Sequence, residues 1–400
     1  MSAGGMRRLS LFMRAIGRIA DEIDMLFLVS QQYIDDSPDL AALSRQQSVL
    51  WQKDIQVSLA PLERRRETFL NHYVLSALSI RHHPFFHAYS GPRQVAAVAE
   101  RLKRNPDFVF VQRMAAMCPI QLIEGALPPI FFDLDDVEHR AKLRAALAPP
   151  HRPGKYAYMA QSPAIHLAER RAARHARAVF VCSEQDRRYL TRLGVNRLHV
   201  VPNAVALPNK QYRAVADQTV MFLGNFGHPP NIGAIERLIR RIWPIIRVSL
   251  PDATLLIAGA GSQTLACSGT LPEGVRILGF VDDLAALYAA SRVICCPLLE
   301  GGGTRVKIIE AAAYGRPVVS SRIGAEGLDL RNGTEIVLAE SDAAIAQACI
   351  ALLTDAQYCR TIGMAAQEKI HALYDPQPIA DAVADLLRRS LPARTPAGCL

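Results

Sequence analysis

The sequence has no apolar run long enough to cross a bilayer. Its longest apolar stretches, at 178–182 and 254–260, are far shorter than the roughly 20 residues that a transmembrane helix needs. Charged residues interrupt the first 24 residues every few positions, so the continuous apolar core of a secretory signal is also missing. These absences argue against an integral membrane protein and predict a protein that stays in the cytoplasm.

Cysteines are few and scattered. Eight occur among 400 residues, and the adjacent pair Cys295 and Cys296 lies inside an apolar run rather than at a metal-ligating spacing. We therefore expect reduced thiols in the core. Low-complexity tracts and short internal repeats are also absent, and half of the residues are hydrophobic, which is typical of a globular protein. A chain of this length predicts two or three domains.

Positive charge is in excess. The net charge is +9 and the pI is near 9.3, with basic runs at 64–66 and 169–178. Such an excess favours anionic partners, which include nucleotide phosphates, nucleic acid and an anionic membrane leaflet. Each single run is equally compatible with an ordinary solvated helix face.

Strand-like and helix-like segments alternate along the whole chain. The strand-like segments of the first half are 23–30, 107–112, 129–136 and 178–183, and those of the second half are 219–226, 253–261, 275–281, 292–299, 317–324 and 335–340. Alternation of this kind predicts parallel α/β sheets. Residues 206–218 lack an apolar period and contain breakers, so we expect the domain boundary there and a ligand-binding cleft between the halves.

Glycines follow several strands of the second half, where open α/β sheets bind ligands. Gly224 and Gly227 follow the first of these strands, before a helix expected to begin near Ile232, and Gly259 follows the second. Glycine lets a backbone approach a ligand closely, although a tight strand exit needs the same residue. A third strand ends in Gly279, Phe280 and Val281, where a backbone edge beside an aromatic ring could hold a nucleobase.

The segment 297–319 is the most informative. Gly301, Gly302 and Gly303 precede a helix whose first turn carries Arg305 and Lys307, with Glu310 about one turn further on. Helix amides and two cations attract phosphate, and a carboxylate accepts hydrogen bonds from ribose hydroxyls. The segment therefore predicts a nucleoside diphosphate site; the alternative is an ordinary turn and a charged helix face.

The segment EGGGTRVKIIEAAAYGRPVVSS (300–321) resembles the signature of the retaining family-4 glycosyltransferases. The resemblance extends over FLGNFGHPPNIGA, IAGAG, ILGFVDDLAALYAASRV and IGAEGL, and more loosely over FFDLDDVEHR and VVPNAV, so that it covers essentially the whole chain. It implies the GT-B fold, in which two Rossmann-like, doubly wound domains face a cleft. We expect an acceptor-side domain at 1–207, a nucleotide-sugar domain at 218–375 and a helix at 376–392 that crosses back.

The resemblance also implies residue roles. Arg305 and Lys307 would hold the donor diphosphate and assist departure of the leaving group, and Glu310 would bind the ribose. The remaining donor-side candidates are Gly224 for the phosphates, Phe280 and Val281 for the base, and Gly301, Gly302, Gly303 and Thr304 in the loop. Asp136, or His139 beside it, would contact the sugar or the acceptor hydroxyl.

Three features depart from the family pattern. Gly302 stands where relatives often have a glutamate, and Glu300 is the candidate for its role. The segment after the first strand of the second half offers only His228 and Arg237 where relatives have an arginine and a lysine. The sequence Gly4–Arg8 matches a glycine-rich loop that follows a strand in relatives, and we expect that this first strand is missing, through a truncated gene model or a missing edge.

The resemblance predicts a metal-independent, hexosyltransferase-type enzyme that needs no cofactor and acts with retention in surface polysaccharide synthesis. Asp133, Asp135 and Asp136 are not assigned to a metal. Expected partners are a nucleotide sugar and a glycan or lipid-linked acceptor, not nucleic acid, with peripheral contact of the basic helix at 6–20 to the inner membrane. The alternatives are a GT-B-fold isomerase of the sugar nucleotide and a catalytically silent nucleotide-binding relative.

Overall fold

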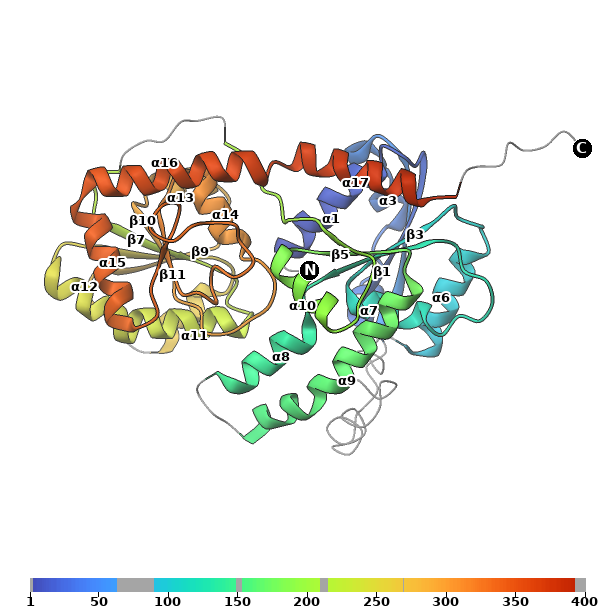
Figure 1. Ribbon diagram of the computed structural model, residues 1–400, viewed down its shortest axis with the longest axis horizontal. Helices are drawn as coiled ribbons and strands as arrows, with labels where there is room; N and C mark the ends of the chain where they lie inside the picture. The colour runs from blue at the N-terminus through green and yellow to red at the C-terminus, as the bar shows by residue number, and fades with distance from the viewer. Residues whose placement is uncertain (1–2, 63–89, 149–152, 209–214, 269, 393–400) are drawn as a thin grey trace, which may run out of the picture. The chain divides into compact units, whose positions relative to one another are not determined.

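The structure, a computed structural model, describes residues 3–62, 90–148, 153–208, 215–268 and 270–392 (Figure 1). Contacts between Cα atoms divide the chain into two compact units. The C-terminal unit comprises Asn203–Pro376 with the residues up to Arg7, and the N-terminal unit comprises Arg8–Pro202 with the residues from Gln377. Part of the expected linker (209–214) and the basic run at 64–66 lie outside the described residues. Among those described, no helix has the length and apolarity of a membrane span.

The C-terminal unit contains a six-stranded parallel sheet in the order β12-β11-β10-β7-β8-β9. Chain order therefore runs outward in both directions from the central pair β7 and β10, which is the doubly wound arrangement. The strands are β7 (Thr219–Leu223), β8 (Thr254–Ala258), β9 (Val275–Gly279), β10 (Val293–Cys296), β11 (Val318–Ser320) and β12 (Val337–Leu338). The carboxyl ends of β7, β8 and β9 are thereby neighbours.

Helices cover both faces of this sheet (Figure 1). They are α11 (Pro229–Arg237), a π-helical turn (Leu238–Ile242), α12 (Trp243–Ser249), a 3-10 turn (Ser262–Ser268), α13 (Leu284–Ala289), α14 (Val306–Ala313), α15 (Asp342–Thr354) and α16 (Ala356–Leu373). Because both faces are covered, the central strands are buried and read as apolar runs. Helix α11 begins at Pro229 rather than near Ile232, since proline suits the first helical position.

The N-terminal unit contains a four-stranded parallel sheet in the order β3-β4-β5-β6 and a separate parallel pair, β1 and β2. The strands are β1 (Glu22–Ser30), β2 (Asp54–Leu62), β3 (Val109–Gln112), β4 (Ile130–Asp135), β5 (Ala178–Val181) and β6 (Leu198–Val200). The helices are α1 (Ala3–Ile16), α2 (Gln31–Asp35), α3 (Leu40–Trp51), α6 (Pro92–Leu102), α7 (Arg113–Ile120), α8 (Glu138–Leu147), α9 (Pro153–His175), α10 (Glu184–Arg192) and α17 (Pro376–Ser390). The residues of α1 up to Arg7 and Pro376 of α17 group with the C-terminal unit. Parallel α/β sheets in both units confirm the predicted fold class.

Helix α1 corrects one expectation: Gly4–Arg8, expected as a loop, forms part of this helix. The structure also shows where the apolar side of the basic helix expected at 6–20 lies. The Phe12 ring is buried, and its centroid lies 4.6 Å from that of Phe110 and 5.2 Å from that of Phe180. The apolar side of α1 is thus buried in the protein core, where it packs against residues far along the sequence.

Helix α17 contacts the N-terminal unit through residues after its start at Pro376. Arg177 Nε donates to the Ser390 carbonyl at 2.5 Å, and Arg388 Nη2 donates to the Arg18 carbonyl at 3.0 Å. Arg18 also forms an ion pair with Asp381. These bonds explain why the residues from Gln377 group with the N-terminal unit.

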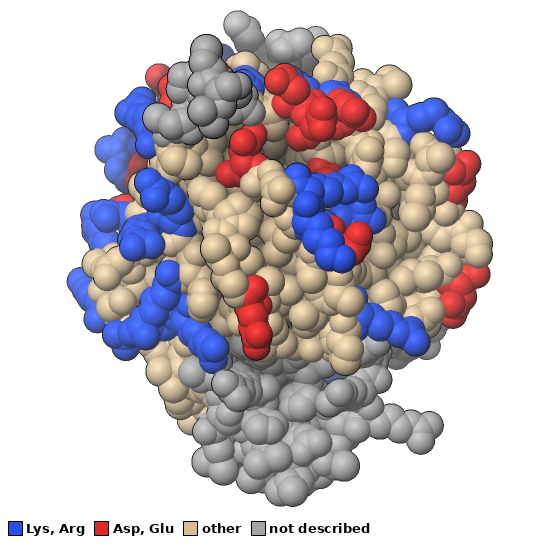
Figure 2. Space-filling view, turned by 90° about the vertical axis from the view of Figure 1, so that its right-hand side faces the viewer, with Lys and Arg blue, Asp and Glu red and all other residues tan. Residues whose placement is uncertain are grey.

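Surface charge is unevenly spread over the described residues. Figure 2 shows one face on which Lys and Arg side chains gather along one side, while Asp and Glu side chains form separate smaller groups. On this face several basic side chains therefore lie close together, and such a group attracts anions.

Candidate functional site

Three strand-end loops of the C-terminal unit are joined by backbone hydrogen bonds. The amide of Gly224, after β7, donates to Ala258 at 3.0 Å, and the amide of Gly259, after β8, donates to Gly279 at 2.7 Å. Gly259 has φ +129°, and a Cβ built on it would collide with the Gly224 carbonyl oxygen. Only glycine permits this approach, which brings bare backbone to the ligand-binding edge of the sheet.

Lys307, in the first turn of α14, reaches the loop after β7. Its Nζ donates to Asn231 Oδ1 at 2.7 Å and lies 4.5 Å from the ring centroid of Phe222. A Cβ on Gly224 would lie 3.1 Å from this Nζ, so the glycine leaves the room that the lysine uses. Burial lowers the pKa of Lys307 to about 8. The lysine is therefore a partly desolvated cation at the carboxyl end of β7.

Arg305 immediately precedes α14 and is wrapped by the three glycines. Its Nη1 donates to the carbonyls of Gly302 and, at 3.2 Å, Gly303. Gly301 has φ +119°, and a Cβ there would lie 2.6 Å from Arg305 Nη2. Desolvation and the charges of Arg305 and Lys307 lower the pKa of His228, so this histidine lies near both cations. Positive charge thus converges on the amino end of α14.

Glu310 lies one turn further along α14. Its carboxylate forms an ion pair with Arg7, which belongs to the same unit. Burial raises the pKa of Glu310, and Arg7 opposes that rise. A buried carboxylate with a cationic partner can exchange that partner for hydroxyl donors, which is the chemistry that ribose recognition needs.

The other donor-side candidates lie in the same unit. The Thr304 hydroxyl accepts a hydrogen bond of 2.8 Å from Asn203 Nδ2. Phe280 directly follows β9 and is 66% exposed, and Val281 beside it is half-buried. Glu300 is partly buried in the loop between β10 and α14. An exposed ring at a strand end suits stacking on a base.

Arg237, in contrast, is engaged elsewhere. Its Nε donates to Asp342 at 2.5 Å, and its Nη groups donate to the carbonyls of Pro297 and Glu340. It therefore joins α11 to the segments that follow β10 and β12, whereas Lys307 is the cation that lies beside Gly224.

The acidic residues at the end of β4 are paired with arginines. Arg8 Nη2 donates to Asp133 at 2.6 Å in the buried interior, and Arg113 Nη2 donates to Asp135 at 2.8 Å. Asp135 has φ +60°, an uncommon conformation outside glycine, at the exit of the strand. Asp136 follows it and is half-buried. Two of the three carboxylates are thus neutralised by cations of the chain.

His139, His166 and Glu169 form a second polar cluster, between α8 and α9. Glu169 lies 2.5 Å from His139 Nδ1, and His139 Nε2 lies 2.9 Å from the Tyr189 hydroxyl. One ligand atom from each of the three lies within 4.8 Å of the others, a spacing that a metal ion could bridge. Hydrogen bonds satisfy both nitrogens of His139, and Asp136, the other acceptor-side candidate, is half-buried after the end of β4.

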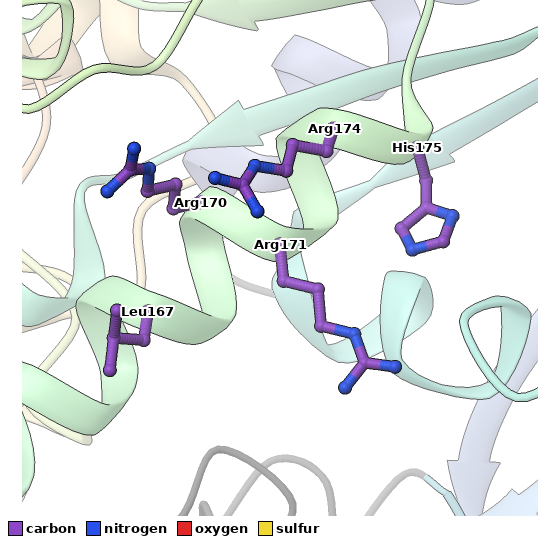
Figure 3. A pocket seen from close by; sticks show the side chains of 5 residues that line it. All are labelled: Leu167, Arg170, Arg171, Arg174 and His175. Atoms are coloured by element: carbon purple, nitrogen blue, oxygen red, sulfur yellow. The ribbon is translucent and has the colours of Figure 1, made fainter.

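A cavity of about 360 Å³ lies on α9 (Figure 3). It is lined by Leu167, Arg170, Arg171, Arg174 and His175, and its polar groups are therefore basic. Figure 3 shows Arg170 and Arg174 extending to one side of the helix and Arg171 to the other. The cavity belongs to the N-terminal unit, whereas the phosphate-binding candidates belong to the C-terminal unit, so we do not assign the donor to it.

In the structure Lys307 lies beside Gly224, and Arg305 and Lys307 both lie near His228. The structure adds Asn231, which fixes Lys307, and Arg7, which pairs with Glu310. Asn231 stands in the motif LGNFGHPPN, but nothing in that motif indicates contact with a lysine 76 residues away. Arg7 lies in the segment Gly4–Arg8, which matches a glycine-rich loop of relatives, but nothing in that segment indicates contact with Glu310.

The two halves of the chain match two glycosyltransferase family models. Residues 48–204 match the model described as glycosyl transferase 4-like domain, and residues 217–355 match glycosyl transferases group 1. The phosphatidyl-myo-inositol mannosyltransferase of Mycobacterium leprae is 36% identical over 142 residues, which are 34% of this chain and 37% of that protein. Glycogen synthase of Mycobacterium tuberculosis is 27% identical over 245 residues, or 57% of this chain and 58% of the relative. The match with the mannosyltransferase thus spans less than half of its length.

Two solved structures resemble almost the entire chain. Sucrose-phosphate synthase from Thermosynechococcus elongatus has a TM-score of 0.64 at 17% identity, covering 92% of this chain and 99% of that one. Anabaena Alr3699/HepE in complex with UDP has a TM-score of 0.64 at 15% identity, covering 97% and 96%. At these identities the likeness concerns the fold, which is GT-B, as expected.

The collision at Gly259 gives a stability prediction. Gly259→Ala is expected to destabilise the C-terminal unit by about 1–3 kcal/mol or more, because a Cβ meets the Gly224 carbonyl and φ is unfavourable. Urea unfolding can be followed by Trp243 fluorescence in a Trp51→Phe background, since the sequence has two tryptophans and Trp243 is buried in this unit.

Gly233→Ala is the matched control. A Cβ there meets nothing within 4 Å, and the residue lies inside α11. This variant is expected to gain about 0.5–1 kcal/mol, as alanine does in helix interiors. Equal unfolding midpoints for the two variants would contradict the proposed role of Gly259.

Proposed function

The chain belongs to the glycosyltransferases that combine a 4-like domain with a group 1 domain, and we propose that it transfers a sugar from a nucleotide diphosphate sugar to a glycan or lipid-linked acceptor. The observation that carries this proposal is the convergence of Arg305 and Lys307 on the amino end of α14, with Glu310 one turn away. Arg305 and Lys307 are then the candidate partners of the phosphates, Glu310 that of the ribose, and Phe280 with Val281 those of the base.

The same geometry supports a reaction that needs no metal or other cofactor. A departing nucleoside diphosphate develops negative charge, and preorganised cations and helix amides stabilise such charge in a site with little water. Arg305 is held by the loop carbonyls and Lys307 by Asn231, so both are fixed before a ligand arrives. Thr304 and the glycines of the loop would line the phosphates.

Retention of the anomeric configuration, a role in surface polysaccharide synthesis and the remaining residue roles belong to the same proposal. Glu300 is proposed to take the role, near the sugar, of the glutamate that relatives often have at the position of Gly302. Asp136, at the end of β4 in the N-terminal unit, is proposed to contact the sugar or the acceptor hydroxyl. The anomeric signals of the product, read by NMR, test retention directly.

We further propose that a peripheral contact with an anionic membrane is made by α9 rather than by α1. Leu167 on α9 is 45% exposed and lies beside Arg170, Arg171 and Arg174, whereas the apolar side of α1 is buried. An exposed apolar side chain flanked by arginines matches the surface of an anionic leaflet, where each basic residue contributes about 1 kcal/mol.

Donor binding tests the proposed function. We expect one of a panel of UDP-, GDP- and ADP-sugars to bind the wild type in calorimetry with EDTA present. The Arg305→Ala, Lys307→Ala double variant is expected to lose at least a hundredfold in affinity, since each charge-assisted bond is worth about 1.5–3 kcal/mol.

One control variant and two further measurements, of divalent-ion dependence and of donor turnover, separate the possible functions. Arg247→Ala is the control, because that arginine pairs with Glu273 and donates to the Ala253 carbonyl, before the amino ends of β9 and β8 and not at the ligand-binding edge, and the variant should bind the donor as the wild type does. Binding that requires a divalent ion would contradict metal independence. Turnover of the donor to an isomer without acceptor would replace the transferase proposal, and binding without any turnover would indicate a silent relative.

Donor affinity is expected to depend on pH through Lys307. Its pKa is lowered to about 8, so its ammonium is present below that pH and is lost as the pH rises through it. Affinity for a nucleotide sugar should therefore fall by about fivefold between pH 8 and pH 9, and the slope should approach one decade per pH unit at higher pH, as expected for a required proton. The Lys307→Arg variant stays charged, so any donor affinity that remains should not change with pH over this range. If its affinity fell with pH as steeply as that of the wild type, the pH dependence would belong to another group.

Vesicle flotation tests the membrane contact. The wild type should float with vesicles containing phosphatidylglycerol and stay below with phosphatidylcholine alone. Arg171→Glu with Arg174→Glu should weaken binding about tenfold or more. The charge-matched control is Arg187→Glu with Arg188→Glu on α10, where both arginines pair with Glu184. Equal loss in both double variants would indicate attraction by net charge, not a surface on α9.

A further inference from the structure

The hydroxyl of Tyr288 is buried without a hydrogen-bond partner among the described residues. Tyr288 lies on α13 and is 0% exposed, so water does not replace the missing partner from the surface. Buried polar groups are almost always paired, because an unpaired one forfeits its hydrogen bond to water. The phenol therefore has a hydrogen-bond donor that the described contacts leave unused.

The neighbours of the Tyr288 ring indicate which acceptor lies near its hydroxyl. The Tyr288 ring stacks on that of Tyr314, with centroids 4.7 Å apart and an interplanar angle of 18°. Tyr314 directly follows α14, and its amide donates to the Glu310 carbonyl at 3.1 Å, so it lies one turn beyond Glu310 on the same side of the helix. Burial raises the pKa of Tyr288, and the negative charge of Glu310 raises it further. The buried hydroxyl therefore lies near the Glu310 carboxylate.

We propose that Tyr288 is a positioning residue for the nucleoside part of the donor: its hydroxyl donates to the Glu310 carboxylate when ribose replaces Arg7 on that carboxylate. This inference rests on the proposed function, because it takes Glu310 as the group that binds ribose. In the structure Arg7 holds the carboxylate, and the Tyr288 hydroxyl has no described partner. With ribose bound, one oxygen would accept from the sugar and the other from Tyr288, which fixes the orientation of the carboxylate.

Tyr288→Phe separates this role from packing. The phenylalanine keeps the ring and its stack on Tyr314 and removes only the unpaired oxygen. The variant should unfold at the same temperature as the wild type or higher, while donor affinity falls about five- to tenfold. The KM for the donor should rise with kcat unchanged at saturation. Tyr314→Phe, which keeps the same stack and is only half-buried, is the control and should bind the donor normally.

A double-variant cycle assigns the effect to Glu310. In a Glu310→Gln background, Tyr288→Phe should cause no further loss of affinity, and a donor lacking the 2′- and 3′-hydroxyls should bind Tyr288→Phe and the wild type alike. A lower unfolding temperature together with additive losses would indicate packing alone and overturn the proposal. Unchanged donor binding by Tyr288→Phe would also overturn it, with the proposed function intact. A wild type that binds no sugar nucleotide would overturn both.

Discussion

The candidate site depends on the close approach of two glycines, Gly224 and Gly259, at the ends of adjacent parallel strands. A side chain on Gly259 would push the two loops apart, and one on Gly224 would displace Lys307. Because both residues are glycine, the backbone segments after β7, β8 and β9 pack closely together, and the Lys307 ammonium lies beside Gly224. The phosphate-binding chemistry that we propose therefore needs this spacing as well as the charges of Arg305 and Lys307.

The charged side chains near these strand ends share one property: other residues of the chain hold each of them in position. Lys307 is held by Asn231, Arg305 by the carbonyls of the glycine loop, and Glu310 by Arg7. Lys307 and Glu310 are partly desolvated, which strengthens their interaction with a ligand and shifts their pKa values. A site of this kind binds an anion with little reorganisation, and that is the condition under which electrostatics accelerate departure of a leaving group.

The two units use arginine differently. In the N-terminal unit Arg8 is buried against Asp133 and Arg113 pairs with Asp135, so these side chains stabilise the end of β4 instead of offering charge to a ligand. On α9, arginines gather around a cavity beside an exposed leucine. Sequence position alone does not separate these cases, since all of them read as basic residues on or near helices. Burial and partner decide which arginines are structural and which are available.

The sequence by itself determined the two α/β series, the glycine loops and the order of Arg305, Lys307 and Glu310 on one helix, because strand and helix periodicity and turn residues act over a few positions. The tertiary structure decided what lies further apart: Asn231 on Lys307, Arg7 on Glu310 and the buried side of α1. The chain segments between such residues contribute nothing to the contact, so no local pattern encodes it. Helix α1 shows the consequence, since its amphipathic pattern fits a membrane surface and a protein core equally well until its neighbours are known.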